Sequence, residues 1–198
     1  MASAQAYEGT IQYDKKKQRA FVSDYSYPAP AVENAIIKKM EKLGYKPKEE
    51  KGILNRDKGF LVFKNAFVTD ISSDKLDFMV KVERKSRKED DAAVLYIIMQ
   101  KDGVNALDIF DAYGVDRAKS FLNNMMPDIE AANLELQIKA QEEVIAKAEK
   151  KLRDLKDDQT SLERKLQENK SDQENTQKDI ENQKQALGTL IGKRKGTL

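Results

Sequence analysis

The chain has 198 residues and an almost balanced charge, with 36 Lys and Arg against 34 Asp and Glu. It contains no Cys and no His, which excludes disulfides, thiolate or imidazole catalysis and the usual nitrogen and sulfur ligands of zinc. The balanced charge argues against a dedicated nucleic-acid-binding protein, because such a protein needs an excess of cations to neutralise phosphates. We therefore predict no enzymatic activity, no bound cofactor or metal, and no nucleic-acid partner.

The first residues contain two overlapping Ala-x-Ala triplets, Ala2–Ala4 and Ala4–Ala6. Small residues at this spacing match the pattern that signal peptidases recognise, although the charged and apolar parts of an export signal do not precede them. We interpret residues 1–6 as a disordered signal-peptide remnant, which predicts a periplasmic or secreted protein. The alternative is an ordinary disordered start of a cytoplasmic protein. No apolar run approaches the roughly 18 residues of a transmembrane segment, so none is predicted.

Residues 7–126 combine strand and helix patterns and predict one α+β domain. Alternation of apolar and polar residues predicts five strands, over 7–13, 19–27, 59–71, 75–84 and 92–100. Apolar residues three and four apart predict one helix that begins at Pro30 and ends before Gly44, and a second that has Asp116 as its N-cap. The charged run 84–91 predicts an exposed hairpin loop. This order predicts a small antiparallel sheet with two helices on one face.

Large side chains of this domain either fill its core or line a cavity for a small apolar ligand. These residues are Phe60, Phe63, Phe67, Phe78, Tyr96 and Met99. Three carboxylates, at Asp70, Asp74 and Asp77, lie near one strand junction, but their spacing lacks the Gly and the terminal Glu of a calcium-binding EF-hand loop. The sequence therefore predicts no metal site, and a filled core is the simpler reading of the aromatic residues.

Beyond Pro127 the composition changes, because residues 128–198 contain no aromatic residue and no proline. Positions spaced alternately three and four apart repeat without a slip from Ala131 to Leu190, which is the pattern of a coiled-coil seam. The large apolar members of this seam are Leu134, Ile138, Ile145, Leu152, Leu155, Leu162, Leu166, Ile180, Leu187 and Leu190. We predict that they bind a partner helix along an arm of residues 127–193, followed by a disordered tail, 194–198.

Charged residues beside the seam predict the direction of the partner helix. In a parallel homodimer like charges would meet, at Lys151 with Lys156, Asp158 with Glu163, and Lys165 with Lys170. In an antiparallel pair centred between residues 160 and 161 opposite charges meet, at Glu135 with Lys184, Glu149 with Lys170, Lys151 with Asp172, Lys156 with Glu163, and Asp158 with Lys165. Each exposed pair contributes only about 0.2–1 kcal/mol, so these charges select an orientation more than they set stability.

Two arrangements satisfy this antiparallel pairing. In the first, one continuous helix on the order of 100 Å long pairs with a second chain. In the second, the arm is a hairpin within one chain that turns at residues 157–161, where Thr160 and Glu163 would form a capping box. The lack of Gly and Pro at the turn favours the continuous helix.

Four features together resemble exported proteins of Bacteroidota-type bacteria that join an α+β domain to a coiled coil. These are the Ala-rich start, the stretch Tyr27–Val32 that opens a helix, the charged hairpin Lys81–Lys88, and the tail rich in Lys, Glu and Gln. The resemblance implies an envelope location and no particular activity. We therefore predict a non-enzymatic cell-envelope interaction or scaffold protein. The alternative is a carrier or sensor of a small apolar ligand in the α+β domain.

Overall fold

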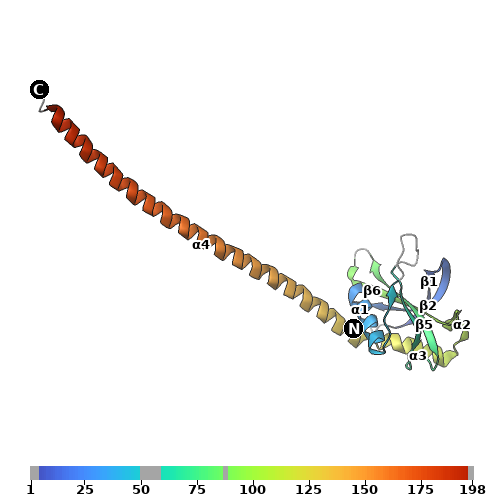
Figure 1. The fold of residues 1–198 in the computed structure, drawn as a ribbon. Helices are drawn as coiled ribbons and strands as arrows, with labels where there is room; N and C mark the ends of the chain where they lie inside the picture. The colour runs from blue at the N-terminus through green and yellow to red at the C-terminus, as the bar shows by residue number, and fades with distance from the viewer. Residues whose placement is uncertain (1–4, 50–58, 87–88, 196–198) are drawn as a thin grey trace. The chain divides into compact units, whose positions relative to one another are not determined.

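The computed structural model describes residues 5–49, 59–86 and 89–195. It divides the chain into two compact units, Met1–Ala140 and Gln141–Leu198. The first unit contains an antiparallel sheet with helices, and the second consists of most of helix α4 (Met126–Lys195), whose first turns belong to the first unit. The predicted α+β fold with a long C-terminal helix is confirmed (Figure 1).

The sheet is antiparallel at every strand pair. Its strands are β1 (Tyr7–Tyr13), β2 (Lys16–Tyr25), β3 (Lys48–Glu49), β4 (Leu61–Phe67), β5 (Lys75–Ser86), β6 (Glu89–Lys101) and β7 (Val104–Asn105). They lie in the order β1-β2-β6-β5-β4-β3, and β7 pairs with β6. The five predicted strands are present, whereas β3 and β7 are too short to show a pattern in the sequence.

Two of the hairpins are closed by two-residue turns. Asp14 and Lys15 join β1 to β2 with φ of 47° and 59°, and Asp102 and Gly103 join β6 to β7 with φ of 53° and 81°. Turns in which both central residues have positive φ match the right-handed twist of the flanking strands. They fix the register and hence the face of the sheet that each side chain occupies.

Strands β5 and β6 extend into the charged run that the sequence assigned to a loop. Ser86 pairs with Glu89, and the Arg84 guanidinium lies 2.7 Å from an Asp90 carboxylate oxygen. The prediction of a loop over 84–91 was therefore wrong at both ends, because cross-strand ion pairs allow charged residues to occupy an exposed end of a hairpin. Residues 87 and 88 lie outside the described part of the chain.

The sheet is strongly curled. The β4 register shifts between Phe63 and Ala66, where Asn65 has a φ of 51° and its N–H donates to Asp77 Oδ1 at 2.8 Å. Such a bulge bends its strand and increases the local twist. The rings of Tyr13 on β1 and Phe60 just before β4 lie 4.9 Å apart, although three strands separate β1 from β4 in the sheet.

Three helices of the first unit precede α4: α1 (Ala29–Lys42), α2 (Ala106–Ile109) and α3 (Ala112–Asn123). As predicted, α1 has Pro30 in its first turn and is followed by Gly44, which has a φ of 90°. The predicted N-cap of α3 was wrong, because Asp111, not Asp116, accepts a hydrogen bond from the N–H of Gly114. The first turn of α3 is exposed, so its apolar periodicity begins only after the helix itself has begun.

The main core lies between one face of the sheet and the helices, as predicted. It includes Phe21 and Leu95 from the sheet, Ile36 from α1, Leu122 from α3 and Ile129 from α4, all no more than 1% exposed. A smaller apolar cluster occupies the opposite face of the curled sheet.

The predicted disorder of residues 1–6 does not extend to Ala6. This residue is buried, and its N–H donates to Asn123 Oδ1 at 2.7 Å, which ties the start of β1 to the end of α3. Residues 1–4 lie outside the described part of the chain.

Candidate partner-binding face of helix α4

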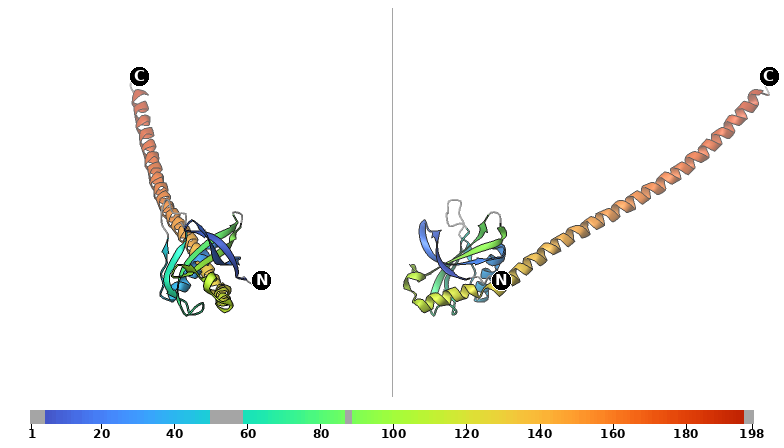
Figure 2. Two further views of the ribbon diagram at one scale, coloured as in Figure 1. Left: turned by 90° about the vertical axis from the view of Figure 1, so that its right-hand side faces the viewer. Right: turned by 180° about the vertical axis from the view of Figure 1, so that it is seen from behind.

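Helix α4 is continuous through residues 157–161, where the alternative prediction placed a hairpin turn (Figure 2). The Thr160 hydroxyl donates to the carbonyl oxygen of Lys156 at 3.0 Å, and the Gln159 amide donates to Glu163 Oε1 at 2.8 Å. Thr160 and Glu163 therefore make contacts typical of a helix interior and form no capping box. The structure has the continuous form of the arm, and the helix extends to Lys195, two residues beyond the predicted end.

The first turns of α4 bury one side of the helix in the core of the first unit. Ile129 and Ala132 are 0% and 2% exposed, whereas Leu134 and Ile138 of the seam are 57% and 44% exposed. Ile129 and Ala132 each lie two residues before a seam position, which places them about 160° around the helix from it. The domain thus holds the side of α4 opposite the seam and cannot cover the seam there.

Polar contacts fix this start of the helix in place. A carboxylate oxygen of Asp128 lies 2.9 Å from Lys39 Nζ and the other lies 3.7 Å from Lys42 Nζ at the end of α1. Asp128 stands in the first turn of α4, where the helix dipole also favours a negative charge. Just before α4, near the end of α3, the Tyr25 hydroxyl donates to the carbonyl oxygen of Leu122 at 2.6 Å, and burial raises the pKa of Tyr25 to about 12.

All ten large apolar residues of the predicted seam lie on α4 and all are exposed, between 43% and 65%. They are Leu134, Ile138, Ile145, Leu152, Leu155, Leu162, Leu166, Ile180, Leu187 and Leu190. Two further exposed apolar residues adjoin them, Val144 at 57% and Ile191 at 40%. Neither was predicted as part of the seam. Each directly precedes or follows a seam residue, and that adjacency was the signal available in the sequence. Together they form an apolar stripe that polar seam residues interrupt, most extensively between Leu166 and Ile180.

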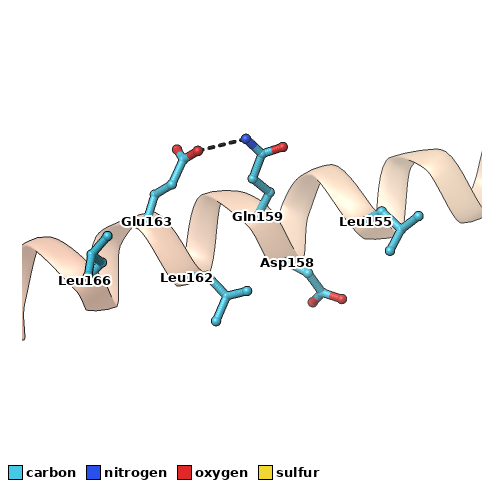
Figure 3. A pocket seen from close by; sticks show the side chains of 6 residues that line it. All are labelled: Leu155, Asp158, Gln159, Leu162, Glu163 and Leu166. Carbon is cyan, nitrogen blue, oxygen red and sulfur yellow. Dashed lines mark hydrogen bonds between the residues drawn. The ribbon is translucent and has the colours of Figure 1, made fainter.

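Charged residues border the stripe on both sides. In Figure 3 Leu162 and Asp158 project to one side of the helix, and Gln159 and Glu163 project to the other. Hydrogen bonds within α4 join residues four apart, such as Gln159 with Glu163 and Gln173 with Asn169. Such pairs stabilise an isolated helix by a few tenths of a kcal/mol each.

The cations and carboxylates that flank the seam remain largely available for a partner. Lys151, Asp158 and Lys165 make no ion pair with any other residue in the described ranges of the chain. The ion pair between Arg164 and Glu168 lies on the side of α4 away from the seam. An apolar stripe with unpaired charges along its borders is the arrangement that a second helix requires.

The α+β domain has a second candidate site, a groove of about 410 Å³ on the sheet. It is lined by Thr10, Ile11, Gln12, Lys81, Glu83 and Tyr96. Lys81 Nζ lies 2.9 Å from Glu83 Oε1, so the two charges at the groove neutralise each other. Burial, followed by the nearby charges of Glu83 and Asp24, raises the pKa of Tyr96. The groove is polar, and it does not correspond to the apolar cavity considered from the sequence.

The aromatic residues considered for that cavity lie apart, with Phe67 41% exposed and the others divided between two separate clusters. Phe60 is fully buried on one face of the sheet, whereas Phe63 and Phe78 are fully buried in the main core on the other face. Side chains on opposite faces of a sheet cannot line one cavity. Their positions favour a structural role.

Two of the three carboxylates considered as metal ligands have cationic partners. Asp74 Oδ2 lies 2.7 Å from Lys101 Nζ, and Asp77 Oδ2 lies 2.8 Å from Lys64 Nζ. Asp77 also accepts the bulge N–H of Asn65. These contacts give both residues a role in holding the loops and the bulge of the sheet.

No family model, curated protein or solved structure matches the chain. The resemblance to exported Bacteroidota-type proteins therefore stays a prediction. Over the described residues, no helix combines the length and the apolar character that crossing a bilayer demands. The exposed seam of α4 is therefore the feature from which we infer a function.

Proposed function

We propose that this protein is a non-enzymatic interaction or scaffold protein of the cell envelope, and that the seam of α4 pairs antiparallel with the seam of a second copy. The observation that carries this proposal is the contrast between the two sides of one helix. Ile129 is completely buried in the domain, while Leu134, little more than one turn later, is 57% exposed on the other side. The apolar stripe thus stays exposed although the domain has a complete core of its own.

The exposed seam is large enough to drive association. Burying a half-exposed Leu or Ile side chain contributes on the order of 1–2 kcal/mol. The polar members of the seam, such as Gln159 and Asn169, reduce the total and restrict the set of registers and partners. These terms fit a specific association of moderate strength.

Charge complementarity supports a second copy of the same chain as the occupant. Under a two-fold axis between residues 160 and 161, Lys156 faces Glu163 and Asp158 faces Lys165, each twice. A parallel dimer would bring like charges together at the same positions. A sequence that is complementary to itself under a two-fold axis is what a symmetric dimer requires.

The envelope location is supported by the Ala-x-Ala triplets and by the resemblance to exported proteins described above. The non-enzymatic role is supported by the absence of His and Cys and by the ion pairs of Asp74 and Asp77. The alternative role as a carrier of an apolar ligand has less support, because the aromatic residues that would contact such a ligand lie on opposite faces of the sheet and Phe67 is exposed.

The proposal is tested by measuring molecular mass as a function of protein concentration, by light scattering or sedimentation. The native chain should change from monomer to dimer, and the variant L155Q/L166Q should remain monomeric. The control S161Q/S171Q introduces the same residue type on the outer side of the helix and should dimerise like the native chain. A native chain that stays monomeric at millimolar concentration would refute the proposal.

Orientation is tested with the variant E149C/K170C, since the native chain has no Cys. Residues 149 and 170 of one continuous helix lie about 31 Å apart, so no disulfide can join them within a chain. In the antiparallel dimer each cysteine faces the other cysteine of the second copy, and oxidation should give covalent dimers. A disulfide formed only within single chains would show that the arm is a hairpin in solution.

A further inference from the structure

We infer that the flanking charges of α4, and not its apolar side chains, fix the register of the dimer. The inference depends on the self-pairing proposed above and adds the residues that determine its specificity. They are the residues nearest the two-fold axis: Lys156 and Glu163 on one side of the seam, Asp158 and Lys165 on the other.

The proposed register brings opposite charges together at every charged flanking pair within the second unit. These pairs are Glu149 with Lys170, Lys156 with Glu163, Lys151 with Asp172, and Asp158 with Lys165. In an antiparallel coiled coil, flanking residues on the same side of the two seams face each other, which fixes these pairings once the centre is chosen. No like charges meet among them.

Sliding one copy by one heptad keeps the seam intact but reverses this pattern. In one direction like charges meet at Glu149 with Glu163 and at Lys151 with Lys165. In the same register Lys156 faces Lys156 of the second copy, and Asp158 faces Asp158 of the second copy. In the other direction like charges meet at Lys156 with Lys170 and Asp158 with Asp172, and Glu163 and Lys165 each meet their own copies. Both slipped registers are therefore disfavoured by repulsion near the centre.

The apolar residues do not discriminate among these registers. The proposed register places Leu155 against Leu166 across the seam. One slipped register instead places Leu152 against Leu162, and the other places Leu162 against Leu166. Each register thus retains a leucine layer near its centre, so hydrophobic burial alone would leave the register poorly defined.

The structure supports a charge-based selection in two ways. Helix α4 is uninterrupted, so the spacing between flanking charges is fixed along the whole second unit. Lys151, Asp158 and Lys165 form no competing ion pairs within the described part of their own chain, so no such contact must break when a second copy binds.

Reversing the charge of Lys156 or Glu163 tests the inference, because the expected effect on dimerisation is opposite for antiparallel and parallel dimers. In the antiparallel register, K156E places Glu against Glu163 twice and should weaken dimerisation about tenfold, as should E163K. In a parallel dimer the same variants would face Lys151 and Asp158, respectively, and should strengthen dimerisation. Controls K150E and D157K reverse charges on the outer side of the helix and should change the dimer little.

Mixing the two variants gives a second readout. An equimolar mixture of K156E and E163K restores both attractive pairs in a heterodimer, so the heterodimer should predominate over either homodimer. The double variant K156E/E163K should dimerise like the native chain. Folding of each variant is checked by circular dichroism, which should show the native helix content.

Spin labels at the single cysteine of S171C measure the register directly. Along the helix axis the two labels would lie about 32 Å apart in the proposed register and about 21 or 42 Å apart in the two slipped registers. Single variants that dimerise more tightly, or labels at a slipped distance, would overturn the inference while leaving self-association intact. A monomeric native chain would instead refute the proposed function itself.

Discussion

Replacing Ile129 with Ala should destabilise the α+β domain, whereas replacing Leu134 with Ala should not. Ile129 is fully buried on the side of α4 that packs against the domain, and removing most of its side chain leaves a cavity in the core. Truncations of this kind cost about 2–5 kcal/mol. Leu134 is 57% exposed in the single chain, so its truncation costs well under about 1 kcal/mol, since Ala is also a good helix former.

Thermal unfolding followed by tyrosine absorbance measures this difference. All seven Tyr precede residue 114, so the signal reports on the first unit alone. For a unit of this size about 3 kcal/mol lowers the unfolding temperature by roughly 10 °C. We expect that shift for I129A and less than about 3 °C for L134A, measured at a concentration where the chain is monomeric.

Sedimentation of the same two variants should show the reverse order. L134A should weaken dimerisation, while I129A should leave it near native at temperatures where the domain is folded. Equal destabilisation of the domain by both variants would refute the assignment of two separate roles to the two sides of α4.

Two further substitutions test the domain. Burial raises the pKa of Tyr25 to about 12, against about 10 in the unfolded chain, so its neutral form stabilises the fold fully below pH 10. About 2–3 kcal/mol is then lost as pH rises to 12. Denaturant titrations should show that Y25F is the less stable protein at pH 8 but loses less stability by pH 11.5. An ideal Cβ on Gly9 lies 2.7 Å from Val22 Cγ2, so G9A should cost about 1–3 kcal/mol in the same assay, and V22A should relieve part of that cost.

The sequence was most informative where structure depends on near neighbours. The seam of α4 is a periodic pattern, and each of its predicted residues lies exposed on one stripe of the helix. Strand β1 likewise has the predicted bounds, because alternation along one strand is a local property. The N-cap of α3 was missed because the first turn after Asp111 is exposed, so the apolar periodicity points to Asp116, five residues later.

Features that depend on distant residues could not be read from the pattern. The curl of the sheet arises from the bulge at Asn65, held by Asp77, and ends in the contact between Tyr13 and Phe60. By contrast, the placement of Phe60 and Phe63 on opposite faces follows from alternation along the chain, because the two residues are three positions apart. The groove on the sheet combines residues of three strands, which no spacing in the sequence relates to one another.

The start of α4 combines two sets of apolar residues, one that packs in the core of the domain and one that belongs to the exposed seam. The α+β domain was predicted to end at residue 126, yet Ile129 and Ala132 belong to its core and the compact unit extends to Ala140. Both residues lie between seam positions, so a reading that follows the seam passes over them. A fragment that ended at residue 126 would lack part of its own core.

Since Ile129 and Ala132 complete that core from within a single polypeptide, the domain can reach its native state before it meets another molecule. Its melting point should therefore be insensitive to dilution, in contrast to obligate dimers, whose apparent stability depends on protomer concentration. A cell could then adjust the proportion of assembled and solitary molecules through expression level alone, without exposing unfolded chains to proteolysis.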